Sequence, residues 1–342
     1  MTSWYIEDGP QSDVVISSRV RLARNLEGYP FPSRMNDTQR EEVIKAVGAA
    51  VLSDKRFGGF TLAYMDKMEP VEKHALVEKH LISRELAANE AKSAVITSGD
   101  ETVSIMVNEE DHLRLQALSS GMQADKAWEL CSSVDDMIDA AKRFAFSMNY
   151  GYLTSCPTNL GTGLRVSFMM HLPALIMTGH IRRVLEACSK LGITLRGLYG
   201  ENSEASGNIL QISNQVTMGL SEEEIIANLN NIATQIISQE RALRGKLHRE
   251  QKLKFEDRIF RSLAVFSSAR IMSSDESLKL LSDLRLGKDM GIIKNVKTET
   301  LNEIMLMIQP ANMQKAAGRS LTNDERDEKR AEYIRGRLGY IW

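Results

Sequence analysis

Arginines gather in short segments of the first two-thirds of the sequence, together with small and hydroxyl-bearing residues. Four segments carry them: SSRVRLAR (17–24), NEEDHLR (108–114), GTGLR (161–165) and RGLYGENSEASG (196–207). A guanidinium presents a planar fork of N–H donors that matches phosphate oxygens, so several converging arginines would bind a polyphosphate. Taken singly, each arginine is more simply interpreted as a surface residue, and spacing alone does not show that the segments meet.

Three adjacent acids follow an apolar segment. They are Glu109, Glu110 and Asp111. Like charges this close need a cation or a proton between them, and a guanidinium or an ammonium would meet that need. The alternative is a solvated acidic turn, and spacing does not decide between the two.

One cysteine lies in a segment rich in hydroxyls, SCPTNLGTGLR (155–165). Donors such as the hydroxyl of Thr158 favour the thiolate form of Cys156 and would make it a reactive or positioning group. The alternative is a buried structural thiol, which is the commoner role of a free cysteine. Cys131 and Cys188 lie in segments with helical periodicity, and for both we expect that structural role.

Composition excludes several classes of protein. The chain has 342 residues, of which 43% are hydrophobic and 26% charged, with a net charge of −2. These values are typical of a soluble globular protein, and they provide no general attraction for nucleic acid. No apolar run approaches the roughly 20 residues that span a membrane, and the first residues do not resemble a signal peptide. Three widely spaced cysteines favour a reduced, cytoplasmic protein, and the scattered histidines predict no metal site.

The periodicity predicts a unit of mixed helices and strands followed by helices alone. Capping boxes at Thr38–Glu41 and Ser221–Glu224 predict two helix starts. The charged segment GKLHREQKLKFEDR, which begins at 245, has no strand pattern and is interpreted as a short hinge before an all-helical C-terminal unit. Further expected elements are strands at 60–65, 164–168, 193–199 and 208–213, a hairpin over 94–107 that turns at 98–100, and helices near 134–147 and over 180–192.

Taken together, the four arginine-bearing segments resemble the phosphagen kinases, the superfamily of creatine and arginine kinases. The matching stretches SSRVRLARNL, NEEDHLR, CPTNLGTGLR and RGLYGENSEASGN occur in the same order as in that family. The loop RGLYGE-SEA and the motif RDEKRA (326–331) are similar to the branch of bacterial protein arginine kinases. Asn202 stands where the family loop usually has a second glycine. The resemblance implies an α+β fold, with a mainly antiparallel sheet flanked by helices in a catalytic domain (1–246) and an all-helical C-terminal domain (255–342).

The resemblance also implies roles for individual residues. The guanidinium substrate would lie between Glu109, Glu110 and Glu201, with Cys156 against it as a positioning group. ATP would bring Mg²⁺ with it, and no metal site of the protein itself is expected. His80 would be an ordinary helix-surface residue on pattern alone, yet it matches an ATP contact. The implied ATP contacts are Ser18, Arg19, Val20, Arg21, Leu22, His80, Arg114, Arg165, Val166, Ser167, Phe168, Met169, Arg196, Gly197, Leu198, Tyr199, Gly200 and Glu201.

The C-terminal motif RDEKRA implies an allosteric site for phosphoarginine. Two arginines would bind the phosphate while Asp327 reads the guanidinium. The alternative is a solvated amphipathic helix, which the pattern alone favours. The implied site residues are Arg326, Asp327, Glu328, Lys329, Arg330 and Ala331.

The resemblance implies a protein arginine kinase that serves the stress response and Clp-protease targeting. Creatine and arginine kinases carry a helical domain before their first such motif, whereas here that motif begins at residue 17, and an open site would suit an arginine on a polypeptide. The alternatives are a kinase for free arginine or another small guanidine, and a non-catalytic phosphoarginine-binding adaptor. Expected partners are protein substrates, a McsA-type activator, the Clp machinery and a second copy in a homodimer, but neither nucleic acid nor a membrane.

Overall fold

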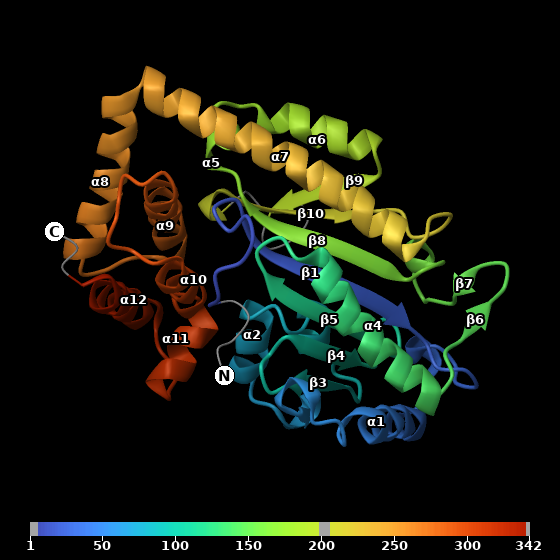
Figure 1. The fold of residues 1–342 in the computed structure, drawn as a ribbon. Helices are drawn as coiled ribbons and strands as arrows, with labels where there is room; N and C mark the ends of the chain where they lie inside the picture. The colour runs from blue at the N-terminus through green and yellow to red at the C-terminus, as the bar shows by residue number, and fades with distance from the viewer. Residues whose placement is uncertain (1–5, 198–205, 340–342) are drawn as a thin grey trace.

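A long antiparallel sheet organises the larger part of the molecule. The structure, a computed structural model, describes residues 6–197 and 206–339 (Figure 1). Among these residues, eight strands lie in the order β2-β3-β4-β5-β1-β8-β10-β9, each antiparallel to its neighbours, and β6 and β7 form a separate hairpin. The predicted α+β class with a mainly antiparallel sheet is therefore confirmed. The strands are β1 (Val15–Arg24), β2 (Phe60–Tyr64), β3 (Ala94–Ser98), β4 (Val103–Val107), β5 (Leu113–Ser120), β6 (Phe146–Ser147), β7 (Gly151–Tyr152), β8 (Leu164–His171), β9 (Ile193–Gly197) and β10 (Ile209–Asn214).

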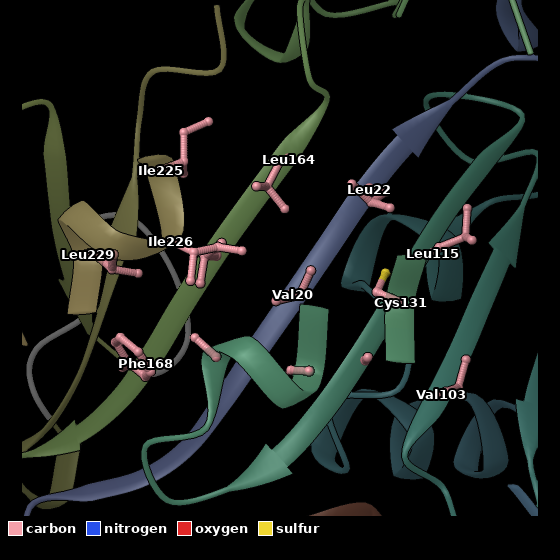
Figure 2. Packing of buried hydrophobic residues seen from close by; sticks show 14 of the residues in the cluster. Val20, Leu22, Val103, Leu115, Cys131, Leu164, Phe168, Ile225, Ile226 and Leu229 are labelled. Carbon is pink, nitrogen blue, oxygen red and sulfur yellow. The ribbon is translucent and has the colours of Figure 1, made fainter. Parts of the chain in front are cut away.

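Helices cover one face of this sheet and enclose the main hydrophobic core. α4 (Ala124–Ala141) packs on β5 and β1, and α7 (Glu222–Glu250) packs on β8 and β10. Figure 2 shows Val20 and Phe168 of the strands in this layer, with Cys131 of α4 and Leu229 of α7. Each fully buried side chain of this size contributes about 1.5–3 kcal/mol. α1 (Asp37–Val51) packs against α4, and α6 (Ile181–Lys190) against β9.

Strand alternation places a different set of residues on the other face. In β1, Val20 and Leu22 are fully buried in the core. Because successive side chains point to opposite faces, Arg19 and Arg21 lie on the face that α4 and α7 do not cover. One strand therefore supplies both the core and the charged face opposite it.

The turn and cap predictions are mostly confirmed. Ser221 and Glu224 form the predicted capping box of α7, and β3 and β4 turn at 98–100. The box predicted at Thr38–Glu41 is wrong, because Asn36 and Gln39 form it and α1 begins at Asp37. Asparagine caps a helix as well as threonine does, and the helix gains its first turn by starting earlier.

The helix predicted near 134–147 is also misplaced. α4 begins ten residues earlier, and its buried stripe starts with the small side chains of Ala124 and Ala127, which give a weak hydrophobic signal. Beyond the helix, the Ala145 N–H donates to the Asn25 carbonyl at 2.7 Å. This contact holds the chain extended as it enters β6. The remaining predicted strands and the helix over 180–192 are present, with ends shifted by a few residues.

The C-terminal third is helical and has a core of its own. The charged segment predicted as a hinge is helical, since α7 continues to Glu250 and the only break before α8 is at Gln251. α11 packs on α2 (Figure 1), and α9 packs beside the Ser206–Asn208 turn. Within residues 6–197 and 206–339, no helix is both long enough and apolar enough to cross a membrane. The helices not yet given bounds are α2 (Pro70–Glu78), α3 (Arg84–Ala88), α5 (Pro173–Met177), α8 (Lys252–Ser268), α9 (Ser274–Asp289), α10 (Thr298–Met307), α11 (Pro310–Ala317) and α12 (Asn323–Leu338).

Candidate active site

A cleft of about 770 Å³ lies over the charged face of the sheet. It brings together residues from β1, β5, β8, β9 and β10 with the segments that follow α2 and β7. The segments singled out in the sequence thus meet in one place, as far as the structure describes them. The predicted site residues that line the cleft are Arg19, Arg21, His80, Glu109, Glu110, Arg114, Cys156, Arg165, Arg196 and Gly197.

The strand register sets arginines opposite one another. Arg21 of β1 is the direct cross-strand partner of Arg165 in β8, and Arg114 of β5 lies opposite Ala23 of β1. Like charges placed directly opposite on adjacent strands destabilise a sheet. A bound polyanion would relieve this repulsion, so the register itself favours a phosphate ligand.

Burial and mutual repulsion act on the same guanidiniums. Burial, together with the nearby Arg114 and Arg165, lowers the pKa of Arg19 to about 10. The pKa of Arg21 is also lowered, first by burial and then by its arginine neighbours. Among the described residues, the buried Nε atom of Arg21 has no hydrogen-bond partner. The close approach of these arginines concentrates positive charge on this face of the sheet.

Arg114 supplies the cation that the acidic cluster requires. Its Nη1 lies 3.0 Å from Oε1 of Glu109, and its Nη2 lies 3.1 Å from Oε2 of Glu110. Burial raises the pKa of Glu109, and Arg114 opposes that rise. The side chain of Glu110 is 44% exposed, so it remains accessible from the cleft. The two carboxylates are therefore spaced to hold a guanidinium between them.

The third acid, Asp111, has a structural role instead. Its Oδ1 accepts hydrogen bonds from the Asn25 side chain at 2.6 Å and from the Ser155 N–H at 2.7 Å. These bonds tie the turn that carries Glu110 to the loop that carries Cys156. The two segments are more than forty residues apart in the chain, and a buried carboxylate fixes their spacing.

The cysteine loop reaches the cleft through a tight backbone path. The sulfur of Cys156 lies 3.0 Å from the hydroxyl oxygen of Thr158, as the hydroxyl-rich segment suggested. Gly161 has a φ of 99°, and a Cβ there would lie 2.4 Å from the Thr217 carbonyl oxygen. Gly163 has a φ of 64°, and a Cβ there would lie 2.7 Å from the Ala23 carbonyl oxygen. Both positions therefore require glycine. The other two cysteines are buried, which confirms their structural interpretation.

His80 does not lie on a helix surface. α2 ends at Glu78, and His80 has a positive φ of 59° beyond it. Its carbonyl oxygen accepts a hydrogen bond of 2.7 Å from the Gln116 side chain. Burial, together with Arg19, lowers the pKa of the imidazole to about 3. The ring is therefore neutral at physiological pH, and His80 lines the cleft together with Arg19.

Several residues assigned to ATP by resemblance do not face the cleft. The Ser18 hydroxyl donates to the Gly121 carbonyl at 2.7 Å, on the buried face of β1. The side chains of Val20, Leu22, Val166 and Phe168 lie in the main core. The assignment of Ser18 and these four residues to ATP is corrected as far as the side chains are concerned, because strand alternation directs them away from the cleft. Ser167 and Met169 lie on the same face of β8 as Arg165 and line a small recess beside Arg19. Leu198, Tyr199, Gly200, Glu201 and Asn202 lie outside the described residues.

The cleft also contains residues that the sequence did not single out. Ser83 donates from its hydroxyl to Oε1 of Glu109 at 2.9 Å and caps α3 at the same time. The carbonyl oxygen of the Gln211 side chain accepts from Nη2 of Arg19 at 2.8 Å. Gln211 lies in β10, a strand of alternating pattern. Its pairing with β8 was the only available signal that this side chain lies at the cleft. Among the described residues, no group of three or more histidine, cysteine or acidic side chains is arranged to hold a metal ion.

The RDEKRA motif lies on α12, with part of it buried. Arg330 is 1% exposed, donates to the carbonyls of Ile308 at 2.7 Å and Met272 at 2.8 Å, and pairs with Asp327. Nε and Nη1 of Arg330 are therefore used within the fold. Most of this side chain is thus committed to structure, contrary to the expectation that both arginines are fully available to a phosphate. Arg326 and Asp327 are partly exposed, Glu328 and Lys329 are exposed, and Ala331 is buried.

Comparison with known proteins agrees with this geometry. Residues 42–243 match the ATP:guanido phosphotransferase C-terminal catalytic domain, and residues 252–341 match the protein-arginine kinase McsB C-terminal domain. A protein-arginine kinase of Brevibacillus brevis is 49% identical over 342 residues, 99% of this chain and 96% of the relative. A protein-arginine kinase of Halothermothrix orenii is 50% identical over 340 residues, 99% of this chain and 97% of the relative. The crystal structure of lombricine kinase shares the fold, with a TM-score of 0.63 and 24% identity over 70% of this chain and 69% of that one.

Proposed function

Because the chain belongs to the ATP:guanido phosphotransferase family, we propose that it is a protein arginine kinase. It transfers the γ-phosphoryl group of ATP to a guanidinium nitrogen of arginine residues in proteins and yields phosphoarginine. The observation that carries this proposal is the cleft itself, in which a face of half-buried arginines adjoins two carboxylates spaced for a guanidinium. Near-full-length similarity to proteins named protein-arginine kinase supports the choice of substrate.

The arginine face would bind the triphosphate. Arg21 and Arg165 lie opposite each other on adjacent strands, and Arg19 lies two residues along β1. A triphosphate supplies the acceptors that these guanidiniums lack, and its negative charge removes their mutual repulsion. Mg²⁺ would accompany the nucleotide and neutralise part of its charge. Phosphoryl transfer depends mainly on alignment and electrostatic stabilisation, so this face would supply much of the rate.

The carboxylates would hold and deprotonate the target arginine. A guanidinium is protonated in water and attacks poorly, so it must lose a proton as the N–P bond forms. Glu110 is the more exposed of the two acids and would accept that proton, while the more buried Glu109 orients the guanidinium. The bond between the γ-phosphorus and the bridging oxygen breaks, and ADP leaves with the electron pair. Cys156 would lie against the guanidinium and position it.

Arg114 links the two halves of the cleft. In the present structure its guanidinium occupies the space between Glu109 and Glu110. The substrate guanidinium needs the same carboxylate oxygens, so Arg114 would turn toward the phosphates when ATP binds. The exchange replaces one charge-assisted pair by another and so has a small net cost in free energy.

Mass spectrometry under non-acidic conditions tests the proposal. The protein is incubated with ATP and either an unfolded protein or free arginine. We expect acid-labile phosphate on arginine nitrogen, mainly in the protein substrate, and we expect Glu110→Gln to abolish it. A matched control is Glu250→Gln, an exposed acid at the end of α7.

Two other functions make different predictions in the same assay. A kinase for free arginine or another small guanidine would place phosphate mainly on the small molecule. A non-catalytic adaptor would consume no ATP at all. Phosphorylation confined to free arginine, or an activity that survives Glu110→Gln, would overturn the proposed function.

We also propose that α12 binds phosphoarginine and regulates the enzyme. Arg326 and Asp327 are partly exposed and next to each other, so they offer a donor for phosphate and an acceptor for the guanidinium. Arg330 would hold Asp327 in place and not contact the phosphate. We expect Asp327→Asn to weaken phosphoarginine binding and leave ATP affinity unchanged in calorimetric titrations. Unchanged phosphoarginine binding would refute the site.

The cellular setting is proposed on resemblance alone. The enzyme would act in the bacterial cytoplasm, in the stress response, and would mark proteins for Clp-protease degradation with a McsA-type activator. The helical unit (255–342) would mediate homodimerisation, and its separate hydrophobic core supports a division from the catalytic unit (1–246). Sedimentation of the full chain and phosphoproteomics of a deletion strain test these two statements.

A further inference from the structure

Exposed apolar side chains lie on both sides of the cysteine loop. Soluble proteins normally scatter such residues singly, so a local group of them marks an interaction surface. Six of them, which we term the apolar rim, are Phe146 (55% exposed), Met148 (93%), Tyr150 (57%), Val216 (47%), Met218 (47%) and Leu220 (39%). The position of these side chains relative to Cys156 determines what kind of ligand they could bind.

The first half of the rim is the β6–β7 hairpin, which projects beyond the ends of β1 and β8 (Figure 1). The hairpin is anchored at its base, where the Tyr152 N–H donates to the Gly161 carbonyl at 2.8 Å. The Tyr152 ring also stacks on the buried guanidinium of Arg24, 3.5 Å from the ring centroid, and contacts the Phe146 ring edge-on. The exposed side chains at the tip are therefore held on a fixed support.

The second half of the rim is joined to the same loop through Thr217. The Thr217 carbonyl accepts from the Thr162 N–H at 2.9 Å, and its hydroxyl donates toward the carbonyls of Thr158 at 3.0 Å and Leu160 at 2.7 Å. Val216 and Met218 are the immediate neighbours of Thr217. The loop that positions Cys156 thus runs between two apolar edges.

The rim is close enough to the cleft to contact the chain around a bound arginine. Tyr150 and Cys156 are six positions apart in the chain, so their Cα atoms are at most about 22 Å apart. Extended polypeptide advances about 3.3 Å per residue, and residues within about six positions of the target arginine can therefore reach the rim. The cleft itself is lined mainly by charged and polar side chains, which recognise the guanidinium and phosphates but offer little to the flanking sequence.

We propose that the apolar rim docks the polypeptide substrate by binding apolar side chains that flank the target arginine in an extended segment. The proposal rests on the proposed function and defines the class of its substrate. Folded proteins bury most of their large apolar side chains, so the rim selects unfolded or locally opened segments. The methionines of the rim are flexible and polarisable, and such surfaces accept varied sequences.

Steady-state kinetics with two peptides test the rim. One peptide carries an arginine flanked by leucine and phenylalanine, the other the same arginine flanked by serine and glycine. We expect wild-type kcat/KM to be about tenfold higher for the apolar peptide, the gain from partly burying two apolar side chains. The double variant M148S/M218S should lose that preference and keep the wild-type rate on the polar peptide, because neither residue touches the cleft.

Leu253→Ser is the matched control, since Leu253 is 82% exposed but lies on α8, outside the rim. It should leave the tenfold preference intact. Equal wild-type rates on both peptides, or a rim variant that keeps the preference, would refute the proposal that the rim docks the substrate. Neither result would contradict the proposed function. A rim variant that changes sedimentation but not peptide preference would identify the rim as a contact between copies and also overturn it. Phosphorylation of free arginine but of neither peptide would overturn the proposed function.

Discussion

The arginine of the RDEKRA motif that packs into the helical unit and the arginines of the cleft differ in how their donors are satisfied. In the helical unit, Arg330 is almost completely buried and donates to two backbone carbonyls and the carboxylate of Asp327. On the sheet, Arg19 and Arg21 are half-buried beside other arginines, and Nε of Arg21 has no hydrogen-bond partner among the described residues. The same side chain therefore completes the fold in one region and depends on a ligand in the other.

The contrast teaches how to recognise an anion site. Burying a guanidinium has a desolvation penalty of several kcal/mol, which must be offset by acceptors of similar quality. A fold that supplies those acceptors itself, as around Arg330, uses arginine for stability. A fold that sets Arg21 directly opposite Arg165 places like charges together, and a bound polyphosphate relieves their repulsion. Four predictions test this distinction.

The largest effect is expected for Arg330→Ala, which should lower the free energy of unfolding by about 3–5 kcal/mol. The substitution leaves Asp327 and two buried carbonyls without their donor. Urea denaturation measures the change. Arg326→Ala, a partly exposed neighbour on the same helix, is the control and should cost less than about 1 kcal/mol. If Arg330→Ala lowered the free energy of unfolding by less than about 1 kcal/mol, Arg330 would not stabilise the fold and the two regions would not differ in this respect.

Arg165→Ala should lower kcat by about 10²–10³ while leaving the stability of the unliganded protein unchanged or slightly higher. The loss of rate follows from a missing phosphate donor, and the retained stability follows from relief of repulsion on Arg21. The comparison needs both kinetics and denaturation of one preparation. Arg261→Ala, on the exposed side of α8, should change neither quantity. Strong destabilisation by Arg165→Ala would show that this arginine belongs to the fold.

ATP should raise the thermal stability of the protein in the absence of an arginine substrate. At about 100 times the dissociation constant, the gain is about 2.7 kcal/mol. Arg21→Ala should abolish most of this gain, because the nucleotide then loses a central partner of the arginine face. Differential scanning calorimetry at fixed ATP concentration measures it. A full gain in Arg21→Ala would place the triphosphate elsewhere.

The smallest effect concerns His80. Its pKa of about 3 lies below that of an ordinary histidine, so the unfolded chain binds a proton that the folded protein does not bind. The contribution of this group to stability therefore rises with pH up to about pH 6.5 and is constant above it. Proton NMR of the imidazole should show no titration between about pH 5 and pH 8, assigned by comparison with His80→Gln. A titration within that range would contradict the burial of His80 against Arg19.

The sequence was most informative where local pattern and resemblance acted together. The arginine-bearing segments, the acidic pair and Cys156 line one cleft, and the resemblance to phosphagen kinases and the fold class are confirmed. Strand alternation would also have separated Val20 from Arg21, yet a resemblance by contiguous stretch assigned both to ATP. The structure corrects the assignment of Val20 to ATP, because this side chain is fully buried in the core.

Contacts between distant segments were beyond any local pattern. Gln211 binds Arg19 across nearly two hundred residues, and Ser83 reaches Glu109 from a helix cap. Arg330 is buried although α12 is strongly polar, because its partners are carbonyls contributed by other segments. Backbone carbonyls carry no sequence signature, so the structural role of this arginine could not be read in advance.

The most direct test is a crystal structure of the protein with a non-hydrolysable ATP analogue and an arginine-containing peptide. We expect the terminal phosphorus to lie against Arg21 and Arg165, the peptide guanidinium to lie between Glu110 and Cys156, and Arg114 to have left the carboxylates for the phosphates. A triphosphate bound away from these arginines, with Arg114 still paired to both glutamates, would contradict the account.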